Sequence, residues 1–243
     1  MRGLDNFRDL GGLRTHDGRT VVSHRLLRSD VPSHLDRDTV GRLRDEVGLT
    51  TVIDLRSPWE LEDDVARPFE ASGVDVLNLP LLSREHRNDA ETALAAGGLA
   101  AYYLRVLTTA ADQLRQVIET VADRPGACLV HCAAGKDRTG VVVAVILRAI
   151  GVTDTDIATD YAKTNENLAA IADRLRRSPG YESLYQRLPT DIHRAEPETM
   201  LQFLSLAEAR HGPIRHYLQS IGVAATTVGS LERQLLNHCE DMT

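Results

Sequence analysis

The chain has 243 residues, of which 42% are hydrophobic and 26% charged, and this composition excludes disordered, collagen-like and disulfide-scaffold proteins. Its formal net charge of -7 argues against binding nucleic acid or an anionic membrane by bulk electrostatics, so an anionic ligand needs a local positive site. Three cysteines, Cys128, Cys132 and Cys239, are too few for a disulfide framework and indicate a reducing compartment.

The first half of the chain alternates strand and helix patterns. Its start lacks the apolar stretch of a signal peptide, so we expect a cytoplasmic protein, with leaderless export left open. Short apolar runs predict buried strands over 51–55, 74–79 and 127–131. Apolar positions at helical spacing, Tyr103 among them, predict helices over 36–46 and 99–121. This alternation favours an α/β fold with a mostly parallel central sheet flanked by helices.

The second half is expected to be helical. The apolar run 139–150 is about half as long as a bilayer span, and we interpret it as a buried helix that ends at Gly151. Further helices are predicted over 154–177, 198–210, 214–221 and 230–238, with Pro197 in a first turn. We interpret residues 1–243 as a single domain: an α/β core over 1–153, a helical segment over 154–196 and C-terminal helices over 197–243.

The segment 131–140, with the sequence HCAAGKDRTG, carries the chemistry. It follows a strand and opens a helix, a geometry that turns successive backbone N–H groups toward one anion. The spacing of Cys132 and Arg138 lets the sulfur lie at the floor of a tight loop and the guanidinium at its side, where it can hold two phosphate oxygens. The same amides stabilise a thiolate, so we expect Cys132 to be a nucleophile near neutral pH. The predicted phosphate-binding residues are Ala133, Ala134, Gly135, Lys136, Asp137 and Arg138.

Other polar groups near this loop have two interpretations each. Lys136 is one of only two lysines in a chain that otherwise uses arginine, and it is expected either to contact a substrate phosphate or to be a solvated surface residue. Thr139 either donates its hydroxyl to the thiolate or caps the helix. Cys128 and Cys239 are interpreted as small structural side chains.

These residues resemble the signature of the cysteine-based protein tyrosine phosphatase superfamily, in which His-Cys is followed by five residues, Arg and Ser or Thr. Three further segments, 6–12, 27–30 and 54–57 with Glu60, make almost the whole chain similar to the atypical bacterial tyrosine and phosphoinositide phosphatases of the PtpB type. The resemblance implies hydrolysis of phosphate monoesters through a phosphocysteine, without metal or cofactor, and a mobile helical lid within 154–196. The supporting residues would be His131, Thr139, Asp54 and Arg56. From the residues alone, Asp54 and Arg56 lie at the strand end where open sheets bind ligands, but a buried ion pair that holds the loop is the preferred interpretation.

The general acid has two candidates. The chain has no Trp-Pro-Asp motif, because its only tryptophan is Trp59 in Ser-Pro-Trp-Glu. Asp137 is the leading candidate by resemblance to the PtpB type, since a carboxyl beside a phosphate dianion is favoured in its protonated form. Asp89, in the polar loop 83–91, is the alternative, because its place is similar to that of the acid in dual-specificity phosphatases.

The substrate is expected to be a phosphorylated protein, most simply at tyrosine, or a phosphoinositide, with inorganic phosphate as product. Neither nucleic acid nor an integral membrane segment is expected. The helices over 154–188 carry Tyr161, Tyr181, Tyr185 and the arginine cluster 174–177, which either form a substrate-contacting lid or pack as an ordinary amphipathic pair.

Three activities compete with a phosphatase. An arsenate reductase would need a resolving thiol, and a sulfurtransferase usually has a shorter loop without this arginine. A phosphate-binding module without catalysis could dispense with the thiol, so the presence of both Cys132 and Arg138 disfavours it.

Overall fold

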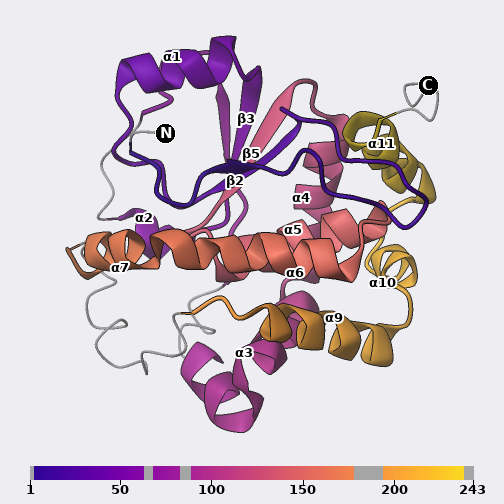
Figure 1. Cartoon of the computed structure of the whole chain (residues 1–243). Helices are drawn as coiled ribbons and strands as arrows, with labels where there is room; N and C mark the ends of the chain where they lie inside the picture. Colours follow the sequence, from indigo (N-terminus) through magenta and orange to yellow (C-terminus); the bar gives the residue numbers. More distant parts are fainter. Residues whose placement is uncertain (1–2, 63–67, 83–88, 178–193, 238–243) are drawn as a thin grey trace.

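The central sheet is the element that positions the loop. The structure, a computed structural model, describes residues 3–62, 68–82, 89–177 and 194–237. Within them, five strands lie in the order β1-β2-β5-β3-β4 (Figure 1). Only β1 runs antiparallel to its neighbour, and the other four strands are parallel, which confirms the predicted α/β fold. The bounds are β1 Arg8–Asp9, β2 Leu26–Ser29, β3 Leu49–Asp54, β4 Asp75–Asn78 and β5 Ala127–His131.

The strands agree with the sequence best where they are central. β5 lies between β2 and β3, and all five of its residues are buried, so a continuous apolar run marks it. β3 begins two residues before the predicted 51–55, and β4 is the exposed edge strand within the predicted 74–79. β1 and β2 were not predicted, because one is two residues long and the other contains Arg28.

Helices make up most of the remainder. The predicted helix 99–121 is in fact two helices that break at Ala110, and the first of them is itself interrupted at Gly98, which has a φ of 82°. Gly151 ends α5 with a φ of 90°, and Pro197 lies in the first turn of α9, both as predicted. The bounds are α1 Arg37–Asp45, α2 Pro58–Leu61, α3 Asp89–Thr109, α4 Ala111–Asp123, α5 Asp137–Ala149, α6 Asp154–Ala162, the 3₁₀ helix η2 Lys163–Asn167, α7 Leu168–Arg177, α9 Pro197–His211, α10 Ile214–Ser220 and α11 Ala225–Leu235.

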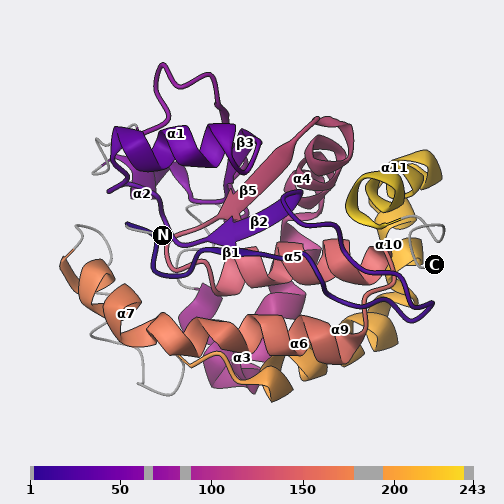
Figure 2. The ribbon, with the colours of Figure 1, turned by 45° about the horizontal axis from the view of Figure 1, so that its top comes forward.

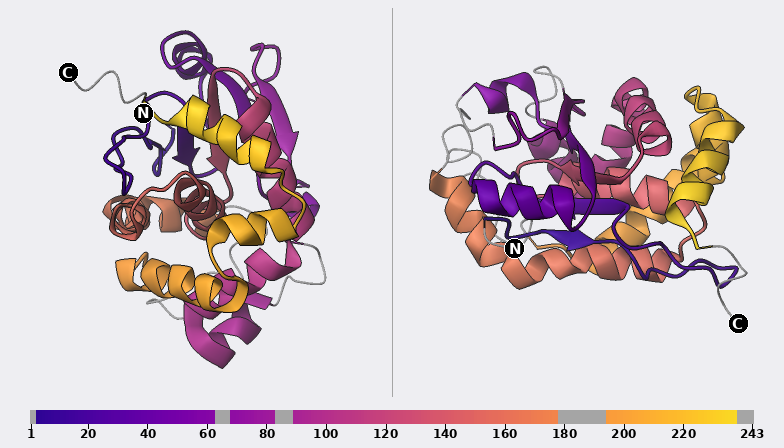
Figure 3. Two further views of the ribbon diagram at one scale, coloured as in Figure 1. Left: turned by 90° about the vertical axis from the view of Figure 1, so that its right-hand side faces the viewer. Right: turned by 90° about the horizontal axis from the view of Figure 1, so that it is seen from above.

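Helices cover both faces of the sheet. Side chains alternate along the strands, so Leu129 packs with the α1 side chains Val40 and Leu43 on one face, while Cys128 and Val130 face a larger core on the other. That larger core includes residues of α3, α4, α5, α6 and α9. Figure 3 shows these layers edge on, with α1 on one side of the sheet and α3 and α9 on the far side.

α5 runs through the larger core and carries the loop at its N-terminus. Ten of its residues are buried, which explains why 139–150 is almost entirely apolar. Gly140 allows α6 to approach, because a Cβ there would lie 3.2 Å from the ring of Tyr161. Among the described helices, none is long and apolar enough to cross a membrane. α6, η2 and α7 follow one another along the same side of the molecule (Figure 2).

Candidate active site

The loop 132–138, here called the anion loop, connects β5 to α5 and is held from behind by three donors. The carbonyl of Ala133 accepts from the backbone N–H of Val31 at 3.1 Å. The carbonyl of Ala134 accepts from Asn6 Nδ2 at 2.8 Å, and that of Gly135 from Arg28 Nη2 at 2.5 Å. A carbonyl and the N–H of the same trans peptide point in opposite directions. The N–H groups of residues 134, 135 and 136 therefore point away from these donors, as an anion-binding loop requires.

Gly135 is required by this close approach. Its φ is 67°, a left-handed conformation, and a Cβ added there would lie 2.2 Å from the carbonyl oxygen of Ser29. The loop is thus fitted tightly against the carboxyl end of β2. This is the edge at which open parallel sheets bind ligands.

The anion loop carries the predicted nucleophile Cys132, acid Asp137 and arginine Arg138, with Asp137 and Arg138 in the first turn of α5. Cys132 is only 2% exposed. The structure therefore brings the predicted nucleophile, arginine and acid together.

Arg138 is oriented by a carboxylate that the spacing argument did not assign to the site. Its Nη1 donates to Glu60 Oε2 at 2.5 Å and its Nη2 donates to Oε1 at 2.7 Å. Glu60 is itself fixed, because Oε2 also accepts from the backbone N–H of Ser57 at 2.7 Å. The sequence contained a signal for this, since Ser57 and Glu60 have the spacing of a helix capping box.

Asp54, Arg56 and His131 form a buried group under the loop. Asp54 Oδ2 lies 2.7 Å from Arg56 Nη2, so the interpretation as a buried ion pair is confirmed. Burial acts to raise the pKa of Asp54, but His131 and Arg56 outweigh it and lower the value. Burial lowers the pKa of His131, although the nearby charge of Asp54 acts to raise it. His131 Nδ1 lies 3.2 Å from the carbonyl oxygen of Cys132.

Lys136 and Asp137 lie side by side. Lys136 is 4% exposed, so the alternative of a solvated surface lysine is wrong. Its Nζ lies 3.3 Å from Asp137 Oδ1 and 3.5 Å from the carbonyl oxygen of Arg194. Asp137 retains 33% exposure and accepts a hydrogen bond from the Tyr103 hydroxyl at 2.6 Å. Contact of Lys136 with a substrate phosphate stays a prediction.

Thr139 is fully buried, and its hydroxyl has no hydrogen-bond partner among the described residues. Its predicted role as helix N-cap is wrong, because Lys136 occupies that position and Thr139 lies inside the first turn of α5. A buried hydroxyl needs a partner. Donation to the ionised sulfur of Cys132 would supply one and stays a prediction.

Two further supports come from segments distant in sequence. Arg28 is 1% exposed within β2, and its Nη1 donates to Asp160 Oδ2 of α6 at 2.8 Å. Arg8 Nε donates to Asp160 Oδ1 at 2.7 Å. Burial acts to raise the pKa of Asp160, but the two guanidinium groups outweigh it and keep the carboxyl ionised. The segments 6–12 and 27–30 therefore brace the anion loop, and Asp160 completes that brace.

α7 covers part of the anion loop. Ile171 and Leu175 pack against Ala133, and Arg174 forms ion pairs with Asp5 and with Asp30. The neighbouring arginines Arg176 and Arg177 are 54% and 78% exposed, as the interpretation of an ordinary amphipathic helix requires. A lid that moves stays a prediction.

Other residues predicted for the site are either buried or lie outside the described part of the structure. Tyr161 is fully buried under the loop, so the expectation that it meets substrate from a lid is wrong. Asp89 is the first residue of α3, but its side chain lies outside the described part of the structure. Tyr181, Tyr185 and Cys239 also lie outside it.

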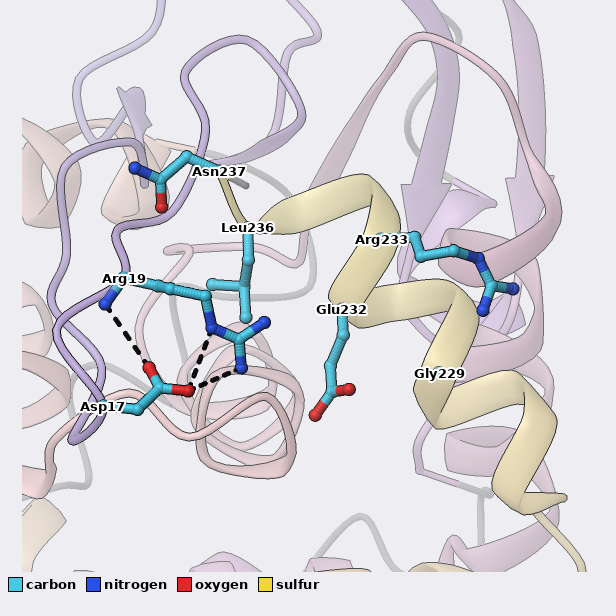
Figure 4. Close-up of a pocket in the computed structure, with 7 residues that line it drawn as sticks. All are labelled: Asp17, Arg19, Gly229, Glu232, Arg233, Leu236 and Asn237. Carbon is cyan, nitrogen blue, oxygen red and sulfur yellow. Dashed lines mark hydrogen bonds and ion pairs between the residues drawn. The ribbon is translucent and has the colours of Figure 1, made fainter. Parts of the chain in front are cut away.

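A hollow of about 370 Å³ lies apart from this site, between the turn at Asp17 and helix α11 (Figure 4). The hollow is close to the C-terminal end of α5, and Arg215 connects the two. Arg215 donates to the carbonyl of Ala149, the last residue of α5, and forms an ion pair with Glu232, which lines the hollow. The anion loop lies at the other end of α5, and a helix of 13 residues is about 20 Å long. The two sites are therefore distinct. The hollow is lined by Asp17, Arg19, Gly229, Glu232, Arg233, Leu236 and Asn237.

Comparison with known proteins agrees with this geometry. A model of the "Tyrosine phosphatase family" matches residues 1–237. The chain is 28% identical to the triple specificity protein phosphatase PtpB of Mycobacterium tuberculosis, over 97% of this chain and 98% of that protein. It is 26% identical to a tyrosine-protein phosphatase of Nostoc commune, over 82% of this chain and 69% of that protein. Among solved structures, the core catalytic domain of the PP-IP phosphatase SIW14 from S. cerevisiae matches 76% of this chain and 86% of its own length, with 14% identity and a TM-score of 0.40.

Proposed function

The chain belongs to the tyrosine phosphatase family and is a cysteine-based phosphatase, and we propose that Cys132, Arg138 and Asp137 carry out its reaction. The observation that supports this most directly is the bracing of the anion loop. Three consecutive loop carbonyls accept from Val31, Asn6 and Arg28, so the amide N–H groups behind them are available to an anion above Cys132.

The first step forms a bond between the Cys132 sulfur and phosphorus. The bond from phosphorus to the leaving oxygen breaks, and Asp137 donates its proton to that oxygen. The charge on the phosphoryl group is stabilised by the loop amides and the guanidinium of Arg138, so catalysis depends on position and electrostatics.

The second step releases phosphate. The carboxylate of Asp137 accepts a proton from water, whose oxygen attacks phosphorus while the sulfur leaves as a thiolate. The buried Thr139 hydroxyl can stabilise that thiolate as it leaves. Inorganic phosphate is the product, and the enzyme returns to its first state.

An arsenate reductase would need a second thiol within reach of the first. Cys128 is 1% exposed inside β5, and burial raises the pKa of its thiol to about 11. It points into the larger core with Val130 and does not serve as a resolving thiol. Among the cysteines of the described chain, only Cys132 suits nucleophilic chemistry.

The proposed principal substrate is phosphotyrosine in proteins, with phosphoinositides as a second class. Because Cys132 is 2% exposed, a phosphate must reach deep into the loop, and an aryl phosphate reaches further than the phosphate of serine. The Mycobacterium relative is named for triple specificity, which supports testing more than one class. Lys136, in the loop and next to Asp137, supplies the additional positive charge that would attract a further phosphate. The three cysteines, too few for a disulfide framework, support a cytoplasmic location.

We expect the wild-type enzyme to favour a phosphotyrosine peptide over the matching phosphoserine peptide by about 100-fold in kcat/KM. The measurement is phosphate release from the two peptides and from a singly phosphorylated inositol lipid in mixed micelles. Equal rates on both peptides would contradict a depth-selective site. Lipid turnover that exceeds peptide turnover would reverse the order of the two substrate classes.

The acid can be assigned by the leaving group. Asp137→Asn is expected to lower kcat/KM for phenyl phosphate by about 100-fold or more, because kcat/KM reports the first step, in which the phenolate is a poor leaving group and needs a proton. The loss should be much smaller for 4-nitrophenyl phosphate, whose leaving group is stable as an anion. Asp89→Asn is the matched control and should leave both rates near wild type. If Asp89→Asn instead shows the selective loss, Asp89 is the acid.

A further inference from the structure

A buried pair of tyrosines lies behind Asp137. Tyr103 of α3 and Tyr161 of α6 are both 0% exposed. The Tyr103 hydroxyl lies 2.6 Å from Asp137 Oδ1, and the two tyrosine oxygens lie 2.7 Å apart. A chain of hydroxyl groups therefore runs from α6 through α3 to the anion loop.

The direction of this chain follows from its end. A carboxylate only accepts hydrogen bonds, so the Tyr103 hydroxyl donates to Asp137 and its oxygen accepts from Tyr161. Burial and the charge of Asp137 raise the pKa of both phenols, so both keep their protons at neutral pH. Each hydroxyl thus has a defined role as donor.

One oxygen of Asp137 contacts two buried polar groups. Oδ1 accepts from Tyr103, and Lys136 Nζ lies 3.3 Å from the same atom. When the carboxyl is protonated, the oxygen that accepts from Tyr103 and lies beside the Lys136 ammonium group is its carbonyl oxygen, so the proton is on Oδ2. Asp137 nevertheless keeps 33% exposure, which is consistent with Oδ2 facing the open side of the loop.

We propose that Tyr103, backed by Tyr161, is a positioning residue that fixes Asp137 with Oδ1 inward and holds the reactive proton on Oδ2, toward the leaving group. The inference rests on the proposed role of Asp137 as general acid. The new element is that the acid depends on the hydroxyl of Tyr103 in α3, 34 positions before Asp137 in the chain.

The surrounding rings make this support rigid. Tyr103 packs edge to face against Tyr161 at a centroid distance of 6.2 Å, and against Phe203 of α9 at 5.8 Å. The ring of Tyr161 lies directly against Gly140 of α5. Helices α3, α5, α6 and α9 therefore lock the two hydroxyl groups in place. A catalytic group must be held to within about 0.5 Å, and a locked neighbour supplies that accuracy.

Tyr103→Phe removes one hydroxyl and keeps the ring. We expect kcat/KM for phenyl phosphate to fall by about 10-fold, because this ratio reports the first step, in which a misdirected acid protonates the leaving oxygen less well. For 4-nitrophenyl phosphate the change should be less than about twofold. Tyr161→Phe, which removes the donor to Tyr103, should show the same selectivity with a smaller loss of about threefold.

The matched control is Tyr217→Phe. Tyr217 is also buried, at 3% exposed, and its hydroxyl donates to the carbonyl of Leu107, outside the site. Removal of the Tyr217 hydroxyl should lower thermal stability about as much as Tyr103→Phe does. The kcat/KM values for phenyl phosphate and 4-nitrophenyl phosphate should stay at the wild-type level. This separates a general loss of core hydrogen bonding from an effect on the acid.

The double variant Tyr103→Phe/Asp137→Asn distinguishes the inference from the function it rests on. With Asp137 already replaced, loss of the Tyr103 hydroxyl should cause no further fall in kcat/KM for phenyl phosphate. An additional fall there, or an equal fall for both substrates in Tyr103→Phe, would overturn the positioning role. If Asp137→Asn itself shows no leaving-group selectivity, the acid assignment fails first and the inference fails with it.

Discussion

Replacing Cys132 by serine is expected to lower turnover of aryl phosphates by about 10⁴-fold or more. A serine hydroxyl is not ionised near neutral pH, and the loop amides and helix dipole that stabilise a thiolate do not make it a comparable nucleophile. The loop itself should remain intact, because its braces are backbone carbonyls and the side chains of Asn6 and Arg28. Binding of inorganic phosphate should therefore stay near the wild-type value while kcat falls.

The intermediate provides a second measurement. Wild-type enzyme mixed with substrate and quenched rapidly in acid should carry a phosphate adduct on the peptide that contains Cys132, and the serine variant should carry none. Cys128→Ala is the matched control, because it removes the other buried thiol of the described residues and should leave turnover unchanged. Wild-type turnover in Cys132→Ser, or an adduct on a different residue, would contradict the proposed nucleophile.

The sequence predicted the anion loop well because its determinants are local. β5, the loop and α5 are consecutive, and each has its own signal in the chain: an apolar run, a glycine and small residues, and a long buried helix. Gly135 is required by contact with Ser29, but the need for a small residue in a tight loop is visible without that contact. The spacing of Cys132 and Arg138 then predicts the chemistry.

β2 could not be predicted in the same way. Arg28 is buried in the middle of the strand, and its partner Asp160 lies 132 positions away. A buried charge is tolerated only when it is paired and hydrogen-bonded, and spacing along the chain does not reveal such a distant pair. Arg28 therefore appears in the sequence as a polar interruption of a short apolar run.

Two supporting side chains were missed for related reasons. Tyr103 belongs to the apolar stripe of its helix, and the ring does pack in the core, so the sequence pattern describes the ring and not the hydroxyl. The capping-box spacing of Glu60 indicates its bond to the Ser57 backbone but not its pairing with Arg138. In both cases the missing information is which distant group the polar atom meets in the folded chain.

The second large effect is expected at Arg138, where replacement by lysine should lower kcat/KM by about 10³-fold. Lysine retains the charge but lacks the planar fork that binds two phosphate oxygens. It also cannot reproduce the paired hydrogen bonds of Nη1 and Nη2 with Glu60 at 2.5 and 2.7 Å. The measurement is steady-state turnover of a phosphotyrosine peptide together with inhibition by inorganic phosphate, which should weaken in parallel.

Glu60→Gln tests whether that orientation matters, since it removes the charge and nearly preserves the shape. Alone it should lower kcat/KM by about 10-fold, because the guanidinium is less firmly directed. In the Arg138→Lys background it should have almost no further effect, because Glu60 acts through the guanidinium that is no longer there. Thermal unfolding must be followed in parallel, since Glu60 is only 8% exposed and breaking a buried ion pair destabilises the fold. If the two losses multiply in the double variant, Glu60 affects catalysis by a route other than Arg138, and the guanidinium is positioned by the loop alone.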